Sequence, residues 1–145
     1  MTTPTPTYFA LESALALRLA GIPGVAVKPA LTTDEDELRR LAGQQPTLAY
    51  AYGGDEVLQS HPGAIRLQQR WIVSLLMRGA GTLERKAADG ELVQALVQAL
   101  HGWTPDERTF EPLVFEGVEC AIFDKTGREY AASFVTETTL TVRYT

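Results

Sequence analysis

The side chains of this sequence that could do chemistry are few and lie far apart. His61 stands before Pro62, and His101 stands before Gly102. Neither histidine belongs to an H-x-x-x-H or C-x-x-C pattern, which zinc sites use to bring ligands together. The serines lack the G-x-S-x-G frame of a nucleophile elbow (Ser13, Ser60, Ser74 and Ser133). A Ser/His/Asp set built from distant segments is the remaining catalytic alternative, and we predict no catalytic residue and no metal site.

The glycine pairs and the single cysteine have plain structural interpretations. The G-A-G at 79–81 follows a strand pattern, but Glu84 stands where a dinucleotide-binding fingerprint has its third glycine, and no Walker lysine is present. We interpret the glycine pairs as turns and predict no cofactor. Cys120 alternates with Val118 and Ile122, so we expect it to be a small buried hydrophobe in the core.

Arginines spaced by even numbers are candidates for contacts. Arg66, Arg70 and Arg78 would share one face of a strand, because side chains alternate between the two faces. Guanidinium groups on one sheet face repel one another unless acidic side chains nearby balance their charge. Glu116 on a following strand could do so, and so could an acidic neighbour across a subunit interface. A solvated face with local partners and a set of inter-subunit salt bridges both remain open.

Two acidic segments are weaker candidates. Asp55 and Glu56 fall in an expected polar loop over residues 55–63, and we keep them as contact candidates because loops often carry binding function. Residues 33–41 place acids before a pair of arginines, which the helix macrodipole favours. We therefore expect a short surface helix there, and an acidic metal site is the alternative.

The arginines lie on the longest strand pattern of the chain, from Ile65 to Arg78. Apolar and polar residues alternate along it, which is typical of a strand with one face in a core. From Trp71 onward, Ile72 and Leu76 make the second face apolar too. Either a helix or a neighbouring subunit should therefore cover that second face.

The remaining patterns predict how this strand is positioned. Strand patterns cover 25–28, 47–52, 65–78, 112–123 and 129–144, and helical patterns cover 8–20, 33–41 and a segment capped by Asp89 that ends at Leu100. The turn D-K-T-G at 124–127 joins the last two strands. The predicted fold class is α+β, with a mostly antiparallel sheet of four to five strands, helices packed on one face and a long C-terminal β-hairpin. Residues 1–7 are expected to form a flexible arm, and residues 8–145 a single domain.

Composition excludes several classes of function. The chain has 145 residues and a formal net charge of −5, whereas a surface that coats nucleic acid needs an excess of Lys and Arg. No apolar run approaches the ~18 residues of a membrane-spanning helix, so we expect no membrane partner. The first seven residues also lack the basic and apolar regions of a signal peptide.

The last strand is long for a domain of this size. From Tyr130 to Tyr144 it would span about 46 Å at roughly 3.3 Å per residue, against a diameter near 38 Å for a compact domain. Its far half is rich in threonine (Thr136, Thr138, Thr139 and Thr141) and has few charges that would protect an edge. We expect it to pair with another chain, and a strand curled within one subunit is the alternative.

The order of these segments resembles a known family. A helix that opens L-E-S-A-L-A-L-R-L is followed by G-I-P-G-V-A-V and by the strand I-R-L-Q-Q-R-W-I-V-S-L-L-M-R. A helix that closes A-L-V-Q-A-L-H-G-W leads to a hairpin with Y-A-A-S-F-V-T-E-T-T. Over about residues 9–140 this pattern resembles the Mu-like phage tail terminator (tail completion) family, which is similar in fold and role to the lambda-type tail terminator.

The resemblance implies a structural role without enzymatic activity. Members of the family form a six-membered ring on the head-proximal end of the tail tube, stop its polymerisation and offer a surface to the head–tail connector. The implied partners are further copies of the chain, the tail tube protein and the connector, while genomic DNA passes through the pore without sequence-specific binding. The implied location is the virion tail, after synthesis in the host cytoplasm. Another neck or tail-tube component, or a small-ligand-binding or enzymatic α+β domain, are the alternatives.

For such a ring we expect a set of residues at the subunit or tube interface. It comprises the arginines, the apolar second face, the acidic pair and the threonines described above: Arg66, Arg70, Ile72, Leu76, Arg78, Asp55, Glu56, Thr136, Thr138, Thr139 and Thr141. Six copies that keep the charge of −5 would carry about −30 around the pore, which would discourage DNA from adhering.

Overall fold

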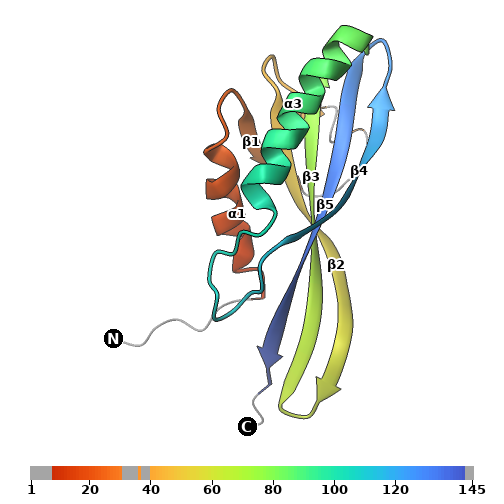
Figure 1. Cartoon of the computed structure of the whole chain (residues 1–145). Coiled ribbons are helices and arrows are strands. Elements are labelled where there is room, and N and C mark those ends of the chain that lie inside the picture. The colour runs from red at the N-terminus through yellow and green to blue at the C-terminus, as the bar shows by residue number, and fades with distance from the viewer. Residues whose placement is uncertain (1–7, 31–35, 37–39, 143–145) are drawn as a thin grey trace.

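The computed structural model describes residues 8–30, 36 and 40–142 (Figure 1). The elements in chain order are α1 (Leu11–Ala20), β1 (Ala26–Pro29), β2 (Thr47–His61), β3 (Ala64–Arg78), α3 (Leu83–Leu100), β4 (Val114–Phe123) and β5 (Gly127–Thr141). The expected arm, most of the expected helix over 33–41 and the last residues of the expected final strand lie outside the described range.

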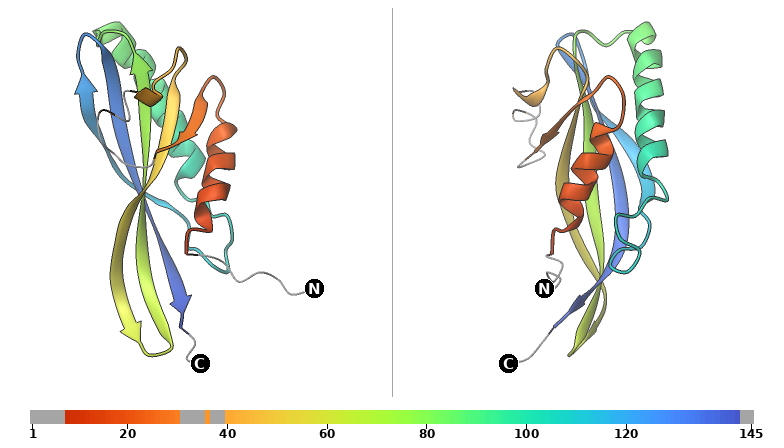
Figure 2. Two further views of the ribbon diagram at one scale, coloured as in Figure 1. Left: turned by 180° about the vertical axis from the view of Figure 1, so that it is seen from behind. Right: turned by 90° about the vertical axis from the view of Figure 1, so that its left-hand side faces the viewer.

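The strands form one sheet in the order β1-β2-β3-β5-β4. β1 runs parallel to β2 through only four residues, and every other neighbouring pair is antiparallel. Both α1 and α3 lie against the same face of the sheet, which we call the helix-side face, while the opposite face is the open face (Figure 2). The predicted α+β class, with a mostly antiparallel sheet and a C-terminal hairpin, is confirmed.

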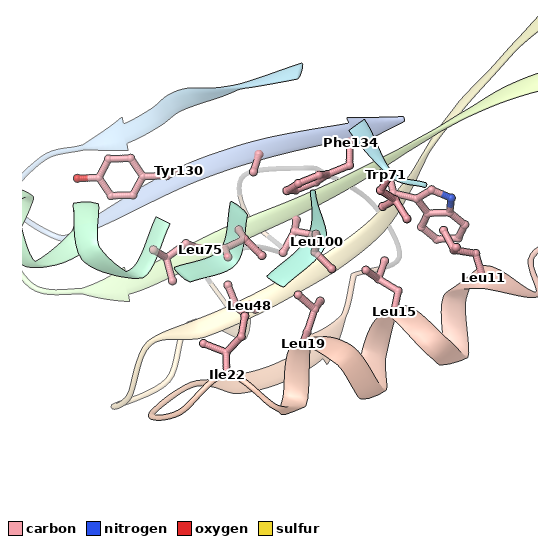
Figure 3. Close-up of a cluster of buried hydrophobic side chains, with 14 of the residues drawn as sticks. Leu11, Leu15, Leu19, Ile22, Leu48, Trp71, Leu75, Leu100, Tyr130 and Phe134 are labelled. Atoms are coloured by element: carbon pink, nitrogen blue, oxygen red, sulfur yellow. The ribbon is translucent and has the colours of Figure 1, made fainter. Parts of the chain in front are cut away.

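The core lies between the helices and the helix-side face. Leu11, Leu15 and Leu19 repeat every four residues along α1, so they form one stripe that is fully buried. Figure 3 shows this stripe facing side chains of the sheet, among them Trp71 and Leu75 of β3. The alternation along β3 therefore places its core residues as the sequence predicts.

β2 is more than twice as long as predicted, because it does not end at the glycine pair. It continues from Thr47 to His61, and the pairing with β3 shifts register between Tyr52 and Gly54. Gly54 has a φ of +104°, a conformation that glycine adopts at little cost. The glycines thus form a β-bulge that lets the strand go on, and the predicted polar loop over residues 55–63 is wrong.

Three strands of fifteen residues each, β2, β3 and β5, project as a ribbon beyond the layer of helices (Figures 1 and 2). Fifteen residues span about 46 Å at roughly 3.3 Å per residue, which exceeds the diameter of a compact domain of this size. The predicted long strand is therefore not curled back on the domain, and much of the ribbon is not covered by a helix.

α3 begins six residues before the predicted cap. Thr82 is its N-cap, and the Thr82 hydroxyl accepts a hydrogen bond from the Arg85 amide at 3.1 Å. Asp89 instead lies inside the helix and is buried. The prediction that Asp89 caps this helix is wrong, because the carboxylate binds a side chain of the sheet rather than the backbone of its own helix.

Cys120 is exposed, so the predicted core position is wrong. It lies on β4 at the edge of the sheet, on the helix-side face beside Tyr130 of β5. Leu96 and Leu100 of α3 are buried in the core cluster with side chains of β3 and β5, whereas Phe115 is the β4 side chain that packs against this cluster. Val118 and Phe123 consequently remain partly exposed on β4, although their alternation is that of a buried strand.

Candidate functional site

The open face of the sheet carries Arg70 near the middle of β3. The guanidinium forms a salt bridge of 2.9 Å with Glu116, which stands in β4 where the pairing shifts register between Phe115 and Gly117. Glu116 reaches across β5 to do so, since β5 lies between β3 and β4. Of the two partners considered from the sequence, Glu116 is therefore the one that the structure places beside Arg70. Both side chains are about 40% exposed, so the bridge itself contributes roughly 0.2–1 kcal/mol.

Arg66 and Arg78 also find partners within the chain. Arg66 donates to Thr139 Oγ1 at 3.0 Å and lies 3.4 Å from Glu111 and 3.7 Å from Glu137. Arg78, at the opposite end of β3, donates through Nε to the Ala42 carbonyl at 3.0 Å. The strand thus separates the arginines into individual local contacts, and their assignment to an interface stays a prediction.

The apolar second face is covered in part by the chain itself. Leu76 is buried with Ala49 beneath Leu41 and Ala42, which belong to the connection between β1 and β2. Ile72 remains half-buried, although Trp71 beside it faces the core and is fully buried. The cover that the sequence requires is therefore supplied locally over Leu76 and only partly over Ile72.

The threonines of β5 divide between the two faces. Thr136 and Thr138 lie on the helix-side face, where they donate to the carbonyls of Glu111 at 2.6 Å and Thr109 at 2.7 Å. Thr109 and Glu111 belong to the connection between α3 and β4, and both threonines are buried beneath this connection. The other two, Thr139 and Thr141, lie on the open face and are exposed, and Thr139 is the residue that accepts the hydrogen bond from Arg66.

Asp55 and Glu56 lie on β2 rather than in a loop. They face opposite sides of the ribbon, opposite Gln69 and Gln68 of β3. Although Asp55 is largely exposed, partial desolvation by its neighbours raises the pKa of its carboxyl group. β1 pairs only with Thr47 to Tyr50, so the outer edge of β2 beside these acids has no neighbouring strand among the described residues.

Two apolar sheet edges were missed from the sequence. The first, which we call the β4 edge, is the outer edge of β4 with exposed Val114, Val118, Cys120 and Phe123. The second, the β2 far edge, is the outer edge of β2 over Gly54–His61 with exposed Val57 and Leu58. The sequence predicted a loop for the second segment and a buried position for Cys120, so it indicated neither edge. The alternation of Val118 and Cys120 was a usable signal, but it does not reveal whether a helix covers the strand.

A buried polar cluster joins α3 to β5 on the helix-side face. Asp89 accepts hydrogen bonds from Arg128 Nε and Nη2 and from the Tyr130 hydroxyl, each at 2.8 Å. The Nη1 atom of Arg128 donates to the carbonyls of Arg78 and Gly79 at 3.0 and 3.2 Å. Hydrogen bonding to Asp89 raises the pKa of Arg128, and burial is the main cause that raises the pKa of Tyr130. Since Asp89 is 1% exposed, the cluster anchors the helix and is closed to a substrate.

The histidines have structural surroundings. Nδ1 of His101 accepts a hydrogen bond from the Phe115 amide at 3.2 Å, at the start of β4. His61 is exposed at the end of β2.

Among the described residues no group of three or more His, Cys, Asp or Glu side chains is arranged to hold a metal ion. Within the same residues, no helix has the length and apolar character needed to cross a membrane.

The family comparison agrees with the order of the elements. A family model described as phage tail terminator protein matches residues 5–143. The chain belongs to the phage tail terminator family. Membership over nearly the whole chain indicates a structural protein of a phage tail, located in the virion, rather than an enzyme.

Solved structures include similar chains. One from the virion of a native gene transfer agent (GTA) particle aligns over 88% of this tail terminator chain and 86% of its own length, with 19% sequence identity and a TM-score of 0.47. Among curated proteins, none matches the sequence.

Proposed function

We propose that six copies of the chain form a ring on the head-proximal end of the tail tube. The ring stops polymerisation of the tube protein and presents a surface to the head–tail connector. The observation that carries this proposal is the family match over residues 5–143. The chain is then made in the host cytoplasm and enters the virion as the tail is completed.

The shape of the subunit supports a ring. A closed ring of identical subunits needs two different surfaces on each subunit, so that every copy contacts the next in the same way. The β4 edge and the β2 far edge are two such surfaces, because they lie on different strands at opposite sides of the sheet. The projecting ribbon adds a further surface that neither α1 nor α3 covers (Figure 1).

Charge supports the passage of DNA through such a ring. Each copy has a formal net charge of −5, so six times −5 gives about −30 for the ring. An acidic ring repels phosphate groups, whereas counterion release at a basic surface would hold them. DNA is therefore expected to pass without binding by sequence.

The test is polymerisation of the tail tube protein of the same phage. With this chain present, tubes should stay short and carry added density at one end in electron micrographs. Incorporation along the whole length of the tube would instead support the second candidate, a tube component. Tubes of unchanged length without bound protein would contradict both roles.

The predicted interface residues are tested by charge reversal. Arg70→Glu places a carboxylate beside Glu116, and Arg66→Glu does the same beside Glu111 and Glu137. Each change should lower the fraction of ring in native mass spectra much more than it lowers the melting temperature. Glu91→Ala, an exposed position on α3, is the matched control. Unchanged assembly in both arginine variants would remove these residues from the interface.

A further inference from the structure

The β4 edge and the β2 far edge present backbone groups that a neighbouring strand could bind. In the described residues, β4 pairs only with β5, and the Gly54–His61 part of β2 pairs only with β3. At the start of β4 the Phe115 amide is already bound to His101, and beyond it none of the described strands adjoins the β4 edge. An exposed strand edge of this kind is a template for pairing with another chain.

The side chains along the two edges match in chemistry. On the helix-side face the β4 edge presents Val118 and Cys120, and the β2 far edge presents Val57, which is 59% exposed. Exposed apolar residues on a sheet edge are unfavourable in a monomer, and cross-strand apolar pairs contribute roughly 0.2–1 kcal/mol each. Val57 and Val118 therefore suit each other better than they suit water, whereas Asp55 is the polar residue on the helix-side face of the β2 far edge.

We propose that the β4 edge of one copy pairs with the β2 far edge of the next copy, so that the sheet continues from subunit to subunit. This inference rests on the proposed ring and specifies its contact. β2, β3, β5 and β4 alternate in direction, so β4 is antiparallel to β2. Since neighbouring copies in a ring have the same orientation, the new pair is antiparallel as well.

The stagger between the two edges fits a closed ring. Val118 pairs with Ala132 of β5, which in turn pairs with Val73 of β3. Val57 pairs with Leu67 of β3, six residues away from Val73. If Val118 and Val57 of neighbouring copies are opposite each other, the copies are offset by six residues of β3, or roughly 20 Å. One copy contributes β2, β3, β5 and β4, which with the gap to the next copy span roughly 19 Å at about 4.8 Å per strand. An offset of about 20 Å over about 19 Å tilts the strands by about 46°, close to the 35–45° of closed barrels.

Acidic side chains at both edges oppose this contact at low ionic strength. In this register Glu56 of one copy lies opposite Glu119 of its neighbour, and like charges directly opposite each other destabilise a strand pair. Salt screens such repulsion between exposed charges. Assembly should therefore strengthen as the salt concentration rises, and Glu119→Gln should strengthen it at low salt.

Cys120 allows the contact to be tested by cross-linking. In Val57→Cys, the new thiol of one copy lies diagonal to Cys120 of the next, at roughly 7–8 Å between Cβ atoms. A short bismaleimide, which adds one thiol at each end, should join successive copies and give a ladder of bands up to six. Wild type, which has Cys120 alone, and the double variant Val57→Cys/Cys120→Ser should each give only the band of a single, uncross-linked chain. Leu17→Cys, at an exposed position on α1, is the matched control that keeps Cys120.

The outcomes separate this contact from the ring itself. A ladder in Val57→Cys and its absence in the Leu17→Cys control support the contact. Cross-linked dimers in wild type would show two β4 edges facing each other and overturn it. Rings in native mass spectra without the ladder would leave the proposed function standing and overturn the contact. A strict monomer at high salt and high protein concentration that also fails to bind tail tubes would contradict both.

Discussion

Removal of the Asp89 carboxylate should be among the most destabilising single changes in this chain. The Arg128 side chain is 8% exposed and points two of its nitrogen atoms at Asp89 at 2.8 Å. Asp89→Ala leaves that guanidinium buried without its counter-charge and removes the acceptor of the Tyr130 hydroxyl. Breaking a buried ion pair from one side costs about 3–5 kcal/mol, which is a large part of a typical stability of about 5–15 kcal/mol.

Urea unfolding followed by tryptophan fluorescence measures this change, because Trp71 is fully buried in the core. The midpoint should fall in Asp89→Ala while the slope with denaturant stays constant. Glu91→Ala, on an exposed position of the same helix, should change the free energy of unfolding by less than about 0.5 kcal/mol. This control separates loss of the buried pair from a change in helix propensity.

A double-mutant cycle decides whether the loss of stability in Asp89→Ala comes from the buried Arg128 charge that is left without its partner. Arg128→Met alone buries the carboxylate without its partner, so it should cost about as much as Asp89→Ala. Asp89→Ala with Arg128→Met buries no charge and should cost clearly less than the sum, with a coupling of about 1–3 kcal/mol. Additive losses, or a loss below about 1 kcal/mol in Asp89→Ala, would refute the assignment of the cluster as an anchor.

Three further predictions follow from other contacts. Glu116→Gln removes the exposed bridge to Arg70 and should cost no more than about 1 kcal/mol, with a smaller loss in high salt; denaturation at two salt concentrations checks this. Gly54→Ala forces a side chain into a φ of +104° and should cost about 1–3 kcal/mol, whereas Gly63→Ala, where an added Cβ meets open space, should cost much less. Folding raises the pKa of Tyr130, so its contribution to stability is full below pH of about 10 and is lost as the pH rises toward its folded-state value. Tyrosinate absorbance during an alkaline titration should show one tyrosine that ionises only with unfolding, and Tyr130→Phe should remove that behaviour.

Local patterns were sufficient where one element decides its own structure. The alternation along β3 predicted which side chains enter the core, and Asp124 and Gly127 predicted the turn of the last hairpin. The bounds of β2 were missed because a glycine pair can either end a strand or form a bulge within it. Which occurs depends on β3 alongside, where Arg70 and Ile72 leave room for a glycine and little room for a Cβ at Gly53.

The candidate surfaces were only partly visible from the sequence. The arginines were identified as a set on one face, and Glu116 was identified as a partner of that face. The sequence did not show that Thr136 and Thr138 are buried by the connection that precedes β4. It also did not show that α3 leaves β4 exposed, because coverage depends on where a helix lies across the sheet and not on the pattern of the strand itself.

The sequence by itself determined the family, the α+β class and the orientation of β3, because these depend on residue order and on spacing along a single segment. The tertiary structure decided which edges of the sheet stay free, which charges are buried and how far the ribbon extends. These properties arise from contacts between residues far apart in the chain, such as Asp89 with Arg128, and local periodicity carries no information about such partners.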